Sequence, residues 1–163
     1  MIMHELLEVS AQIGGMHSDN PIINFTYKLI KKRKLKEICK KIDKLPYPSS
    51  KDIIGFTALY ITSAGMDVDG DVSYLNTEEI YATINTLYSG VQYIIYPAKP
   101  ERASYDEYTV TIHEGSIEYG GIRHNPSCDR YAKIYPEYVN KYLMAIIKVG
   151  MKQLCTKAIL GGN

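Results

Sequence analysis

A chain of 163 residues and 18.4 kDa has the size of one ordinary domain and is long enough to bury a hydrophobic core. Hydrophobic residues make up 45% and charged residues 23% of it, which excludes a disordered tail, a collagen-like repeat and a disulfide-stapled miniprotein. The net charge of +1 conceals a basic, acidic, basic order, with +4 over residues 1–46, −7 over 47–130 and +4 over 131–163. Such a partition favours a polarised surface, one face of which suits anionic partners.

The cysteines Cys39, Cys128 and Cys155 are odd in number and lack paired spacing, which argues against a disulfide framework and for a reducing compartment. Residues 1–13 do not resemble a secretory signal, and the longest apolar run, 142–149, is interrupted by Lys148. We therefore expect a cytoplasmic protein without a membrane partner. The bias towards Ile, Lys, Tyr and Asn, whose codons are AT-rich, is typical of low-GC bacterial and viral genomes, so a viral or mobile-element origin fits.

The first strong helix signal begins at Pro21, after the polar residues 18–20 that can cap a helix. It ends at Leu45-Pro46. Apolar residues follow two stripes: an early stripe of Ile22, Phe25, Thr26 and Leu29, and a late stripe of Leu35, Ile38, Cys39, Ile42 and Leu45. At about 100° per residue these stripes point to nearly opposite sides. The pattern predicts a break within residues 31–34, or a helix wedged between two partners.

The middle of the chain favours strands. Residues 56–63 are rich in β-branched and aromatic side chains, and Asp69-Gly70 is a preferred hairpin turn, with residues 71–75 as the returning strand. The spacing of apolar residues at 80–88 predicts a helix that closes at Ser89-Gly90. Residues 91–96 form an apolar run typical of a buried strand.

A hairpin of residues 108–113 and 116–123 is the clearest expected element. With Glu114-Gly115 as its turn, Ile112 faces Ile117 and Val110 faces Tyr119 on an apolar side, while His113 faces Ser116 on a polar side. A bulge at Gly120-Gly121 returns Ile122 to the apolar side. Pro136 opens a final helix that ends at Gly161-Gly162.

These elements predict a single α+β domain over residues 1–163. It contains an antiparallel sheet of about four to five strands, with helices before, within and after it that pack mainly on one face. We expect many of the fifteen tyrosines to fill the core, because the chain has only two phenylalanines and no tryptophan.

The densest functional signal is a basic cluster at residues 28–44, which carries nine of the nineteen positive groups and only Glu37 and Asp43 as acids. On a helix, like charges four residues apart form one ridge and repel unless an anion neutralises them. The candidate anion-binding residues are Lys32, Arg33, Lys36, Lys40 and Lys44. The alternative is a solvated helix face without a partner. Lysines without interleaved aromatic residues suit phosphate or carboxylate contacts and do not read bases.

A second candidate is the acidic segment around Asp69-Gly70. The candidate metal ligands Asp67, Asp69, Asp71 and Glu78 occupy positions one, three, five and twelve of a segment that resembles an EF-hand calcium loop, with Ser73 at position seven. The resemblance implies a calcium or other divalent metal as the possible cofactor. Val72 stands where the family has glycine, and a plain hairpin turn is the alternative. Otherwise no cofactor is expected.

Weak catalytic candidates are His113, Glu114, His124 and Cys128, whose side-chain types bind zinc or act as bases and nucleophiles. The expected hairpin places His113 at its turn and His124 at its far end, about 20 Å away at ~3.3 Å per residue, so one zinc ion cannot bridge the two. A surface histidine and a buried structural thiol are the alternatives.

Three functions remain open, and the absence of phosphate-loop, nucleophile-elbow and dinucleotide motifs leans away from an enzyme. The first is a small non-catalytic binding protein that engages nucleic acid or an acidic protein through the lysine-rich helix. The second is a small metal-dependent hydrolase or nuclease that uses His113, Glu114 and the segment His124 to Asp129. The third is a self-assembling structural component that forms a homo-oligomer through the C-terminal helix.

Overall fold

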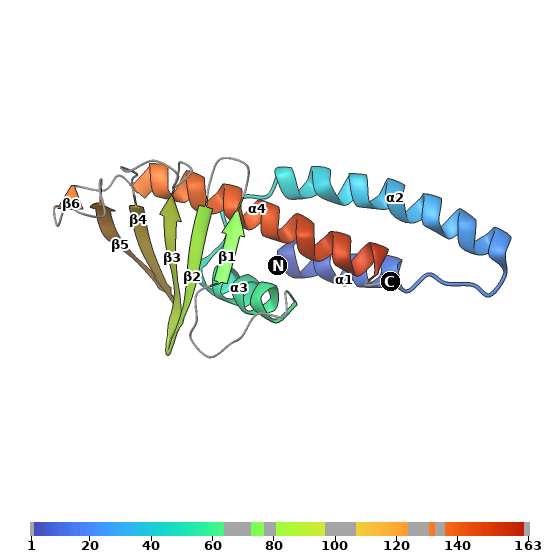
Figure 1. Ribbon diagram of the computed structural model, residues 1–163, viewed down its shortest axis with the longest axis horizontal. Coiled ribbons are helices and arrows are strands. Elements are labelled where there is room, and N and C mark those ends of the chain that lie inside the picture. Colours follow the sequence, from blue (N-terminus) through green and yellow to red (C-terminus); the bar gives the residue numbers. More distant parts are fainter. Residues whose placement is uncertain are drawn as a thin grey trace. The chain divides into compact units, whose positions relative to one another are not determined.

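The structure is a computed structural model, and its elements group into two compact units (Figure 1). The helical unit comprises Met1–Pro46 and Gly150–Asn163, and the sheet unit comprises Tyr47–Val149. This grouping does not test the prediction of one domain, because a single helix, α4 (Pro136–Leu160), contributes to both units. The residues that the structure describes are 2–63, 73–76, 81–96, 107–123, 131–132 and 136–161.

The helical unit packs α1 (Ile2–Gly14), α2 (Pro21–Asp43) and the last part of α4 around a shared core. Helix α1 was not predicted. Its buried hydroxyl, Ser10, donates a hydrogen bond of 2.7 Å to the carbonyl of Leu6. Three elements supply the buried side chains of this core. Helix α1 supplies Met3, Leu6 and Ser10, and α4 supplies Met151, Leu154, Cys155 and Ile159. Helix α2 supplies Ile38 and Ile42, and Leu45 follows just after its end.

Helix α2 begins where the sequence predicts. The side chain of Asn20 accepts hydrogen bonds from the backbone N–H groups of Ile22 (2.9 Å) and Ile23 (3.4 Å), which satisfies two donors that a helix start leaves unpaired. The predicted break within residues 31–34 is wrong, because α2 continues without interruption to Asp43. Only Ile38 and Ile42, from the late apolar stripe, are buried within it.

The sheet unit is built on one antiparallel sheet whose strands follow one another in chain order, from β1 to β6 (Figure 1). Four strands of seven or eight residues form its centre, and two short strands lie at its edges. The burial of β3 alternates residue by residue, so one face of the sheet is covered. The strands are β1 (Ser73–Asn76), β2 (Tyr81–Leu87), β3 (Gly90–Tyr96), β4 (Glu107–His113), β5 (Ser116–Arg123) and β6 (Tyr131–Ala132).

The predicted hairpin of β4 and β5 is confirmed in its register. His113 pairs with Ser116, Ile112 with Ile117 and Val110 with Tyr119. The turn glycine, Gly115, adopts φ +88°, a conformation that glycine reaches without steric cost. The register then shifts, so that Thr109 pairs with Gly121 and Ile122 pairs with Tyr108, as the predicted bulge requires.

Residues 56–63 form a helix, and the prediction of a strand there is wrong. They belong to α3 (Ser50–Ser63), whose buried residues recur at helical spacing and face the sheet. Ser49 caps this helix, because its hydroxyl oxygen accepts a hydrogen bond from the N–H of Asp52 at 3.2 Å. Burial at helical spacing outweighs the strand propensity of the β-branched residues. The buried residues are Ile53, Phe56, Thr57, Tyr60 and Ile61.

The helix predicted at 80–88 is also wrong, because Tyr81–Leu87 is strand β2. Leu87 pairs with Gly90 across the two-residue turn Tyr88-Ser89, so Ser89 and Gly90 belong to a hairpin and do not end a helix. On its other side, β2 pairs with β1, which overlaps the strand expected at 71–75. Residues 56–63, which were expected to pair with that strand as a hairpin, belong to helix α3 instead. The expected turn at Asp69-Gly70 lies outside the described residues.

The helices of the sheet unit cover the same face of the sheet. The hydroxyl of Tyr93 on β3 meets that of Thr57 on α3, and both groups are buried. On the same face, the hydroxyl of Tyr119 donates a hydrogen bond of 2.9 Å to Asn140 of α4, and the ring of Tyr108 packs against that of Tyr142 with centroids 5.5 Å apart. These contacts confirm the predicted α+β class with helices on one face. The four long strands match the expected number, whereas no helix lies between the strands in the described residues.

Candidate anion-binding surface

The five predicted anion-binding residues are all exposed to solvent. Helix geometry explains why: Lys40 lies two residues from both buried isoleucines, Ile38 and Ile42, and two residues turn a helix by about 200°. Lys36 lies two residues before Ile38, so it too points away from the buried side of the helix. The ridge of Lys32, Arg33, Lys36 and Lys40 therefore points away from the core of the helical unit. Lys44 caps the end of α2 and continues the ridge.

The two acids of the basic cluster pair with cations other than the five candidates. Glu37 lies 3.5 Å from Lys34, and Asp43 lies 2.6 Å from Lys152 on α4. Within the described part of the chain, none of the five candidate cations forms an ion pair. The positive charge of the ridge is therefore not neutralised by these parts of the chain, and it remains available to an external anion.

A second feature of α2 was not predicted. The early apolar stripe of Ile22, Phe25 and Leu29 faces solvent, with 78%, 63% and 54% of these side chains exposed. Sequence spacing showed that the two stripes point in opposite directions, but it did not show which one the core covers. The prediction of a helix covered on two sides is not met by the described residues, because α2 is covered only on the side of the late stripe.

The catalytic candidates in the described residues lie at the turn of β4 and β5. His113 Nε2 is 3.6 Å from a carboxylate oxygen of Glu118, and its Nδ1 is 3.4 Å from the hydroxyl of Ser89. Ser89 belongs to the turn between β2 and β3, 24 residues away in sequence, and nothing local in the sequence signals this contact. Ser89 and Glu118 are exposed. A serine, a histidine and a carboxylate thus meet in one row on the molecular surface.

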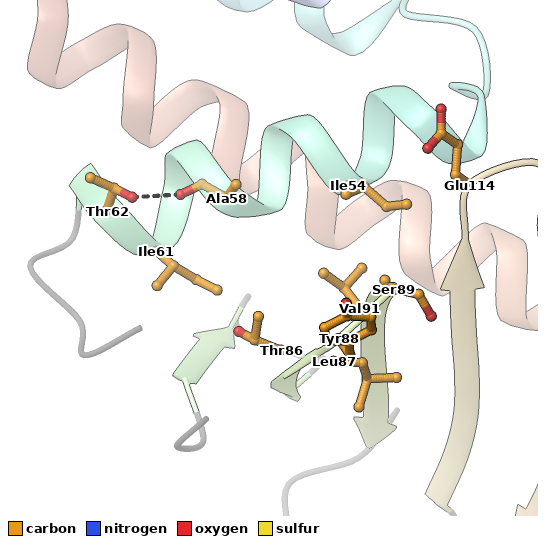
Figure 2. Close-up of a pocket in the computed structure, with 11 residues that line it drawn as sticks. Ile54, Ala58, Ile61, Thr62, Thr86, Leu87, Tyr88, Ser89, Val91 and Glu114 are labelled. Atoms are coloured by element: carbon orange, nitrogen blue, oxygen red, sulfur yellow. Dashed lines mark hydrogen bonds between the residues drawn. The ribbon is translucent and has the colours of Figure 1, made fainter. Parts of the chain in front are cut away.

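A hollow of about 370 Å³ lies between α3 and the β2–β3 hairpin (Figure 2). Figure 2 shows Ile54 and Ile61 on the helix side and Val91 and Thr86 on the strand side. Ser89 and Glu114 also line the hollow. Two side chains of types that can act in catalysis, a hydroxyl and a carboxylate, therefore border an apolar space. Its walls include the fully exposed Tyr88, and it is therefore an open surface depression.

The remaining candidates lie outside the described residues. These are the calcium-loop candidates Asp67, Asp69, Asp71 and Glu78, together with His124 and Cys128. Within the described ranges, no three His, Cys, Asp or Glu side chains gather closely enough to hold a metal ion. The thiol of Cys155 is buried, and burial raises its pKa, so it is a poor nucleophile.

The helices in the described residues include none with the length and apolar character needed to cross a bilayer. The chain matches no protein-family model, no curated protein and no solved structure in the comparisons.

Proposed function

We propose that the protein is a small, non-catalytic binding protein that engages an anionic macromolecule through the exposed ridge of α2. The observation that carries the proposal is that five cations of α2 and its C-terminal end are exposed and form no ion pair with the residues that the structure describes. They are Lys32, Arg33, Lys36, Lys40 and Lys44. Crowded ammonium and guanidinium groups repel one another, and a bound anion relieves that repulsion. Burial of Ile38 and Ile42 anchors the helix so that the ridge is presented on a rigid element.

The ridge contains four lysines and one arginine, which suits contact with many phosphates or carboxylates as point charges. Binding of this kind depends strongly on salt, because each contact displaces counterions. The cytoplasmic location and the viral or mobile-element origin remain predictions from the sequence.

The test compares two triple variants. R33Q/K36Q/K40Q removes three charges of the ridge, and K51Q/K141Q/K157Q removes three exposed charges elsewhere. We expect the protein to bind polyglutamate and duplex DNA with an affinity that falls at least roughly tenfold between about 50 and 200 mM salt. The ridge variant loses this binding, and the control variant retains most of it. An affinity that is flat with salt, or equal losses in the two variants, would contradict the proposal.

A second candidate function is hydrolysis, and the row formed by Ser89, His113 and Glu118 supports it. In this version Ser89 acts as the nucleophile, His113 as its base and Glu118 as the group that orients the histidine, without a metal. The open position of Ser89 favours the binding function instead, because a nucleophile in a water-exposed turn lacks the shielded site that acyl transfer uses. If a fluorophosphonate labels the protein and Ser89→Ala abolishes the labelling, hydrolysis becomes the favoured function in place of binding.

In the third hypothesis, a second copy covers the apolar residues of the C-terminal helix. Val139, Leu143, Ile146 and Ile147 are fully buried within one chain, as are Met151 and Ile159 further along α4. These positions therefore require no second copy to be covered. Self-assembly through α4 remains a prediction, and no contact in the described residues favours it.

A further inference from the structure

The exposed face of α2 changes along the helix axis from an apolar half to a basic half. Ile22, Leu29 and Lys36 are spaced by seven residues, which is nearly two full turns, so they lie on one side of the helix. The first half of this side presents Phe25 together with Ile22 and Leu29, and the second half presents the cations of the ridge. From Ile22 to Lys40 the face is about 27 Å long at ~1.5 Å per residue.

We propose that this face is a docking surface for an acidic amphipathic helix of a partner protein, with an apolar half that meets Ile22, Phe25 and Leu29 and an acidic half that meets Arg33, Lys36 and Lys40. This inference builds on the proposed function and names the class of the anionic partner. Single exposed apolar side chains are common on protein surfaces. Three in line at positions i, i+3 and i+7 are the arrangement through which a helix is recognised by a partner.

Nucleic acid fits this face less well than a protein does. Phosphates pair with the cations of the ridge, but the aliphatic side chains of Ile22 and Leu29 gain nothing beside a phosphate backbone. Base stacking requires aromatic or guanidinium planes, and the apolar half offers only Phe25. The apolar half would thus remain exposed in a complex with nucleic acid.

A lipid surface also fits poorly, because the polarity of a bilayer changes with depth, from the headgroups to the acyl chains, and not along its surface. A helix that lies on a membrane buries apolar side chains along its whole length and keeps its cations at the level of the headgroups. On α2 the chemistry changes along the axis, so the same orientation that inserts Phe25 and Leu29 would press Lys36 and Lys40 towards the acyl chains. A partner whose own surface changes along its length meets both halves.

A second copy of α2 is not complementary to the first. Parallel pairing brings the cations of one ridge against those of the other, and full antiparallel pairing places cations against Ile22, Phe25 and Leu29. Antiparallel pairing through the apolar halves alone overlaps by only about two to three turns. That overlap is short for a stable interface, which usually buries about 1,200–2,000 Å².

Helix dipoles indicate the orientation of the partner. Acidic residues are stabilised near the N-terminus of a helix, and cations near the C-terminus, where α2 carries Lys40 and Lys41. A partner helix with its acidic half first therefore aligns its acids with the ridge when it runs antiparallel to α2. Its apolar half then reaches the early stripe.

The probe is a fluorescent synthetic peptide of 20 residues with glutamates in its first half and leucines in its second half, at helical spacing. Three altered peptides serve as controls, one with the two halves exchanged, one with glutamine for glutamate and one with serine for leucine. We expect the first peptide to bind. The peptide with exchanged halves meets both halves of the face when it runs parallel to α2, so it loses only the helix-dipole contribution, about two- to fivefold in affinity. The glutamine and serine peptides lose at least about tenfold. Loss of one half of the contact removes either the ion pairs or the apolar burial.

Variants of exposed residues test the other side of the contact. F25S/L29S and K36Q/K40Q each weaken binding of the peptide at least about tenfold. Ile23→Ser and Lys41→Gln change exposed residues on a different side of α2 and leave binding within about twofold. Circular dichroism and thermal melts show that each variant keeps its fold.

Several results would overturn the inference. They are an absence of peptide binding, binding of the glutamine or serine peptide as tight as that of the first peptide, or no effect of F25S/L29S on the peptide. Another is a loss of binding to phosphatidylserine vesicles or duplex DNA in F25S/L29S, which would assign the apolar half to lipid or nucleic acid. A dimer in sedimentation runs that F25S/L29S abolishes would assign it to a second copy. If polyglutamate still binds in a salt-dependent manner through Lys36 and Lys40, the proposed function survives these results.

Discussion

The ammonium group of Lys152 on α4 lies 2.6 Å from a carboxylate oxygen of Asp43, the last residue of α2. Both side chains are partly exposed, so the pair adds little to stability. Its effect is electrostatic, because Asp43 is the acid closest in sequence to Lys44 and lies three residues from Lys40. The contact directs that carboxylate towards another cation and away from the ridge.

Replacing Asp43 with asparagine therefore strengthens binding to polyanions. Removal of one negative charge beside the ridge, with release of Lys152, raises the affinity for polyglutamate roughly two- to fivefold at low salt. Lys152→Gln has the opposite effect, since it removes a cation that offsets the negative charge of Asp43 beside the ridge. Titrations by fluorescence anisotropy check both variants. If the two changes move the affinity in the same direction, the ridge is not the binding surface.

The two apolar stripes of α2 differ in their contribution to folding. Ile42 is fully buried, whereas 54% of Leu29 is exposed. Ile42→Ala leaves a cavity in the core of the helical unit and lowers the free energy of unfolding by about 2–5 kcal/mol. Leu29→Ala changes it by less than about 0.5 kcal/mol. Urea denaturation of the two variants measures the difference, and a large loss for Leu29→Ala would show that the early stripe is covered.

The sequence predicted best where local pattern and long-range burial agree. The β4–β5 hairpin combines strict alternation with a glycine turn, so its register followed from residues that are neighbours in the chain. In α3, β-branched residues favoured a strand, although Ile53, Phe56 and Tyr60 recur at helical spacing. For β2 the error was the reverse, because strand pairing with β1 and β3 outweighed an apparent helical period.

The candidate surface was predictable in part for the same reason. Charge density identified the five cations of the ridge, because it depends on composition alone. The exposure of Phe25 and Leu29 depends on which side of α2 the other helices cover, and that is a property of tertiary packing. The contact between Ser89 and His113 joins two turns that are distant in sequence, so no local pattern contains it.

The buried hydroxyl pair of Thr57 and Tyr93 makes a prediction about stability. Thr57 donates its proton to the carbonyl of Ile53 at 2.6 Å, so the hydroxyl of Tyr93 donates to Thr57. Thr57→Val leaves the Tyr93 hydroxyl buried without its partner and costs about 1–3 kcal/mol. Tyr93→Phe costs about 1 kcal/mol, because Thr57 keeps its own bond. The double variant is less destabilised than the sum of the single changes. Additive losses in chemical denaturation would refute this coupling.

Alkaline pH weakens the sheet unit through its tyrosines. Burial, followed by the nearby Tyr119, raises the pKa of Tyr47 to about 12, and burial raises the pKa of Tyr93 further. Since the unfolded chain releases these protons near pH 10, the stabilising effect is complete below pH 10 and is lost as the pH rises towards 12. Tyr47→Phe and Tyr93→Phe flatten the decline. The free energy of unfolding, measured from pH 8 to about 11.5, checks this expectation, and an unchanged slope in both variants would contradict it.

The close approach of α1 to α4 depends on a glycine. A Cβ atom on Gly14 would lie 1.9 Å from the carbonyl oxygen of Ala158, a backbone atom that cannot move without shifting α4. Gly14→Ala therefore forces the two helices apart and lowers the free energy of unfolding by at least about 1–3 kcal/mol. Gly55→Ala is the matched control, since its added Cβ would meet no atom within 4 Å apart from its chain neighbours and the nearby backbone of its own helix. Inside α3 it stabilises the protein by about 0.5–1 kcal/mol. Equal melting temperatures for the two variants would show that α1 does not pack on α4 as described.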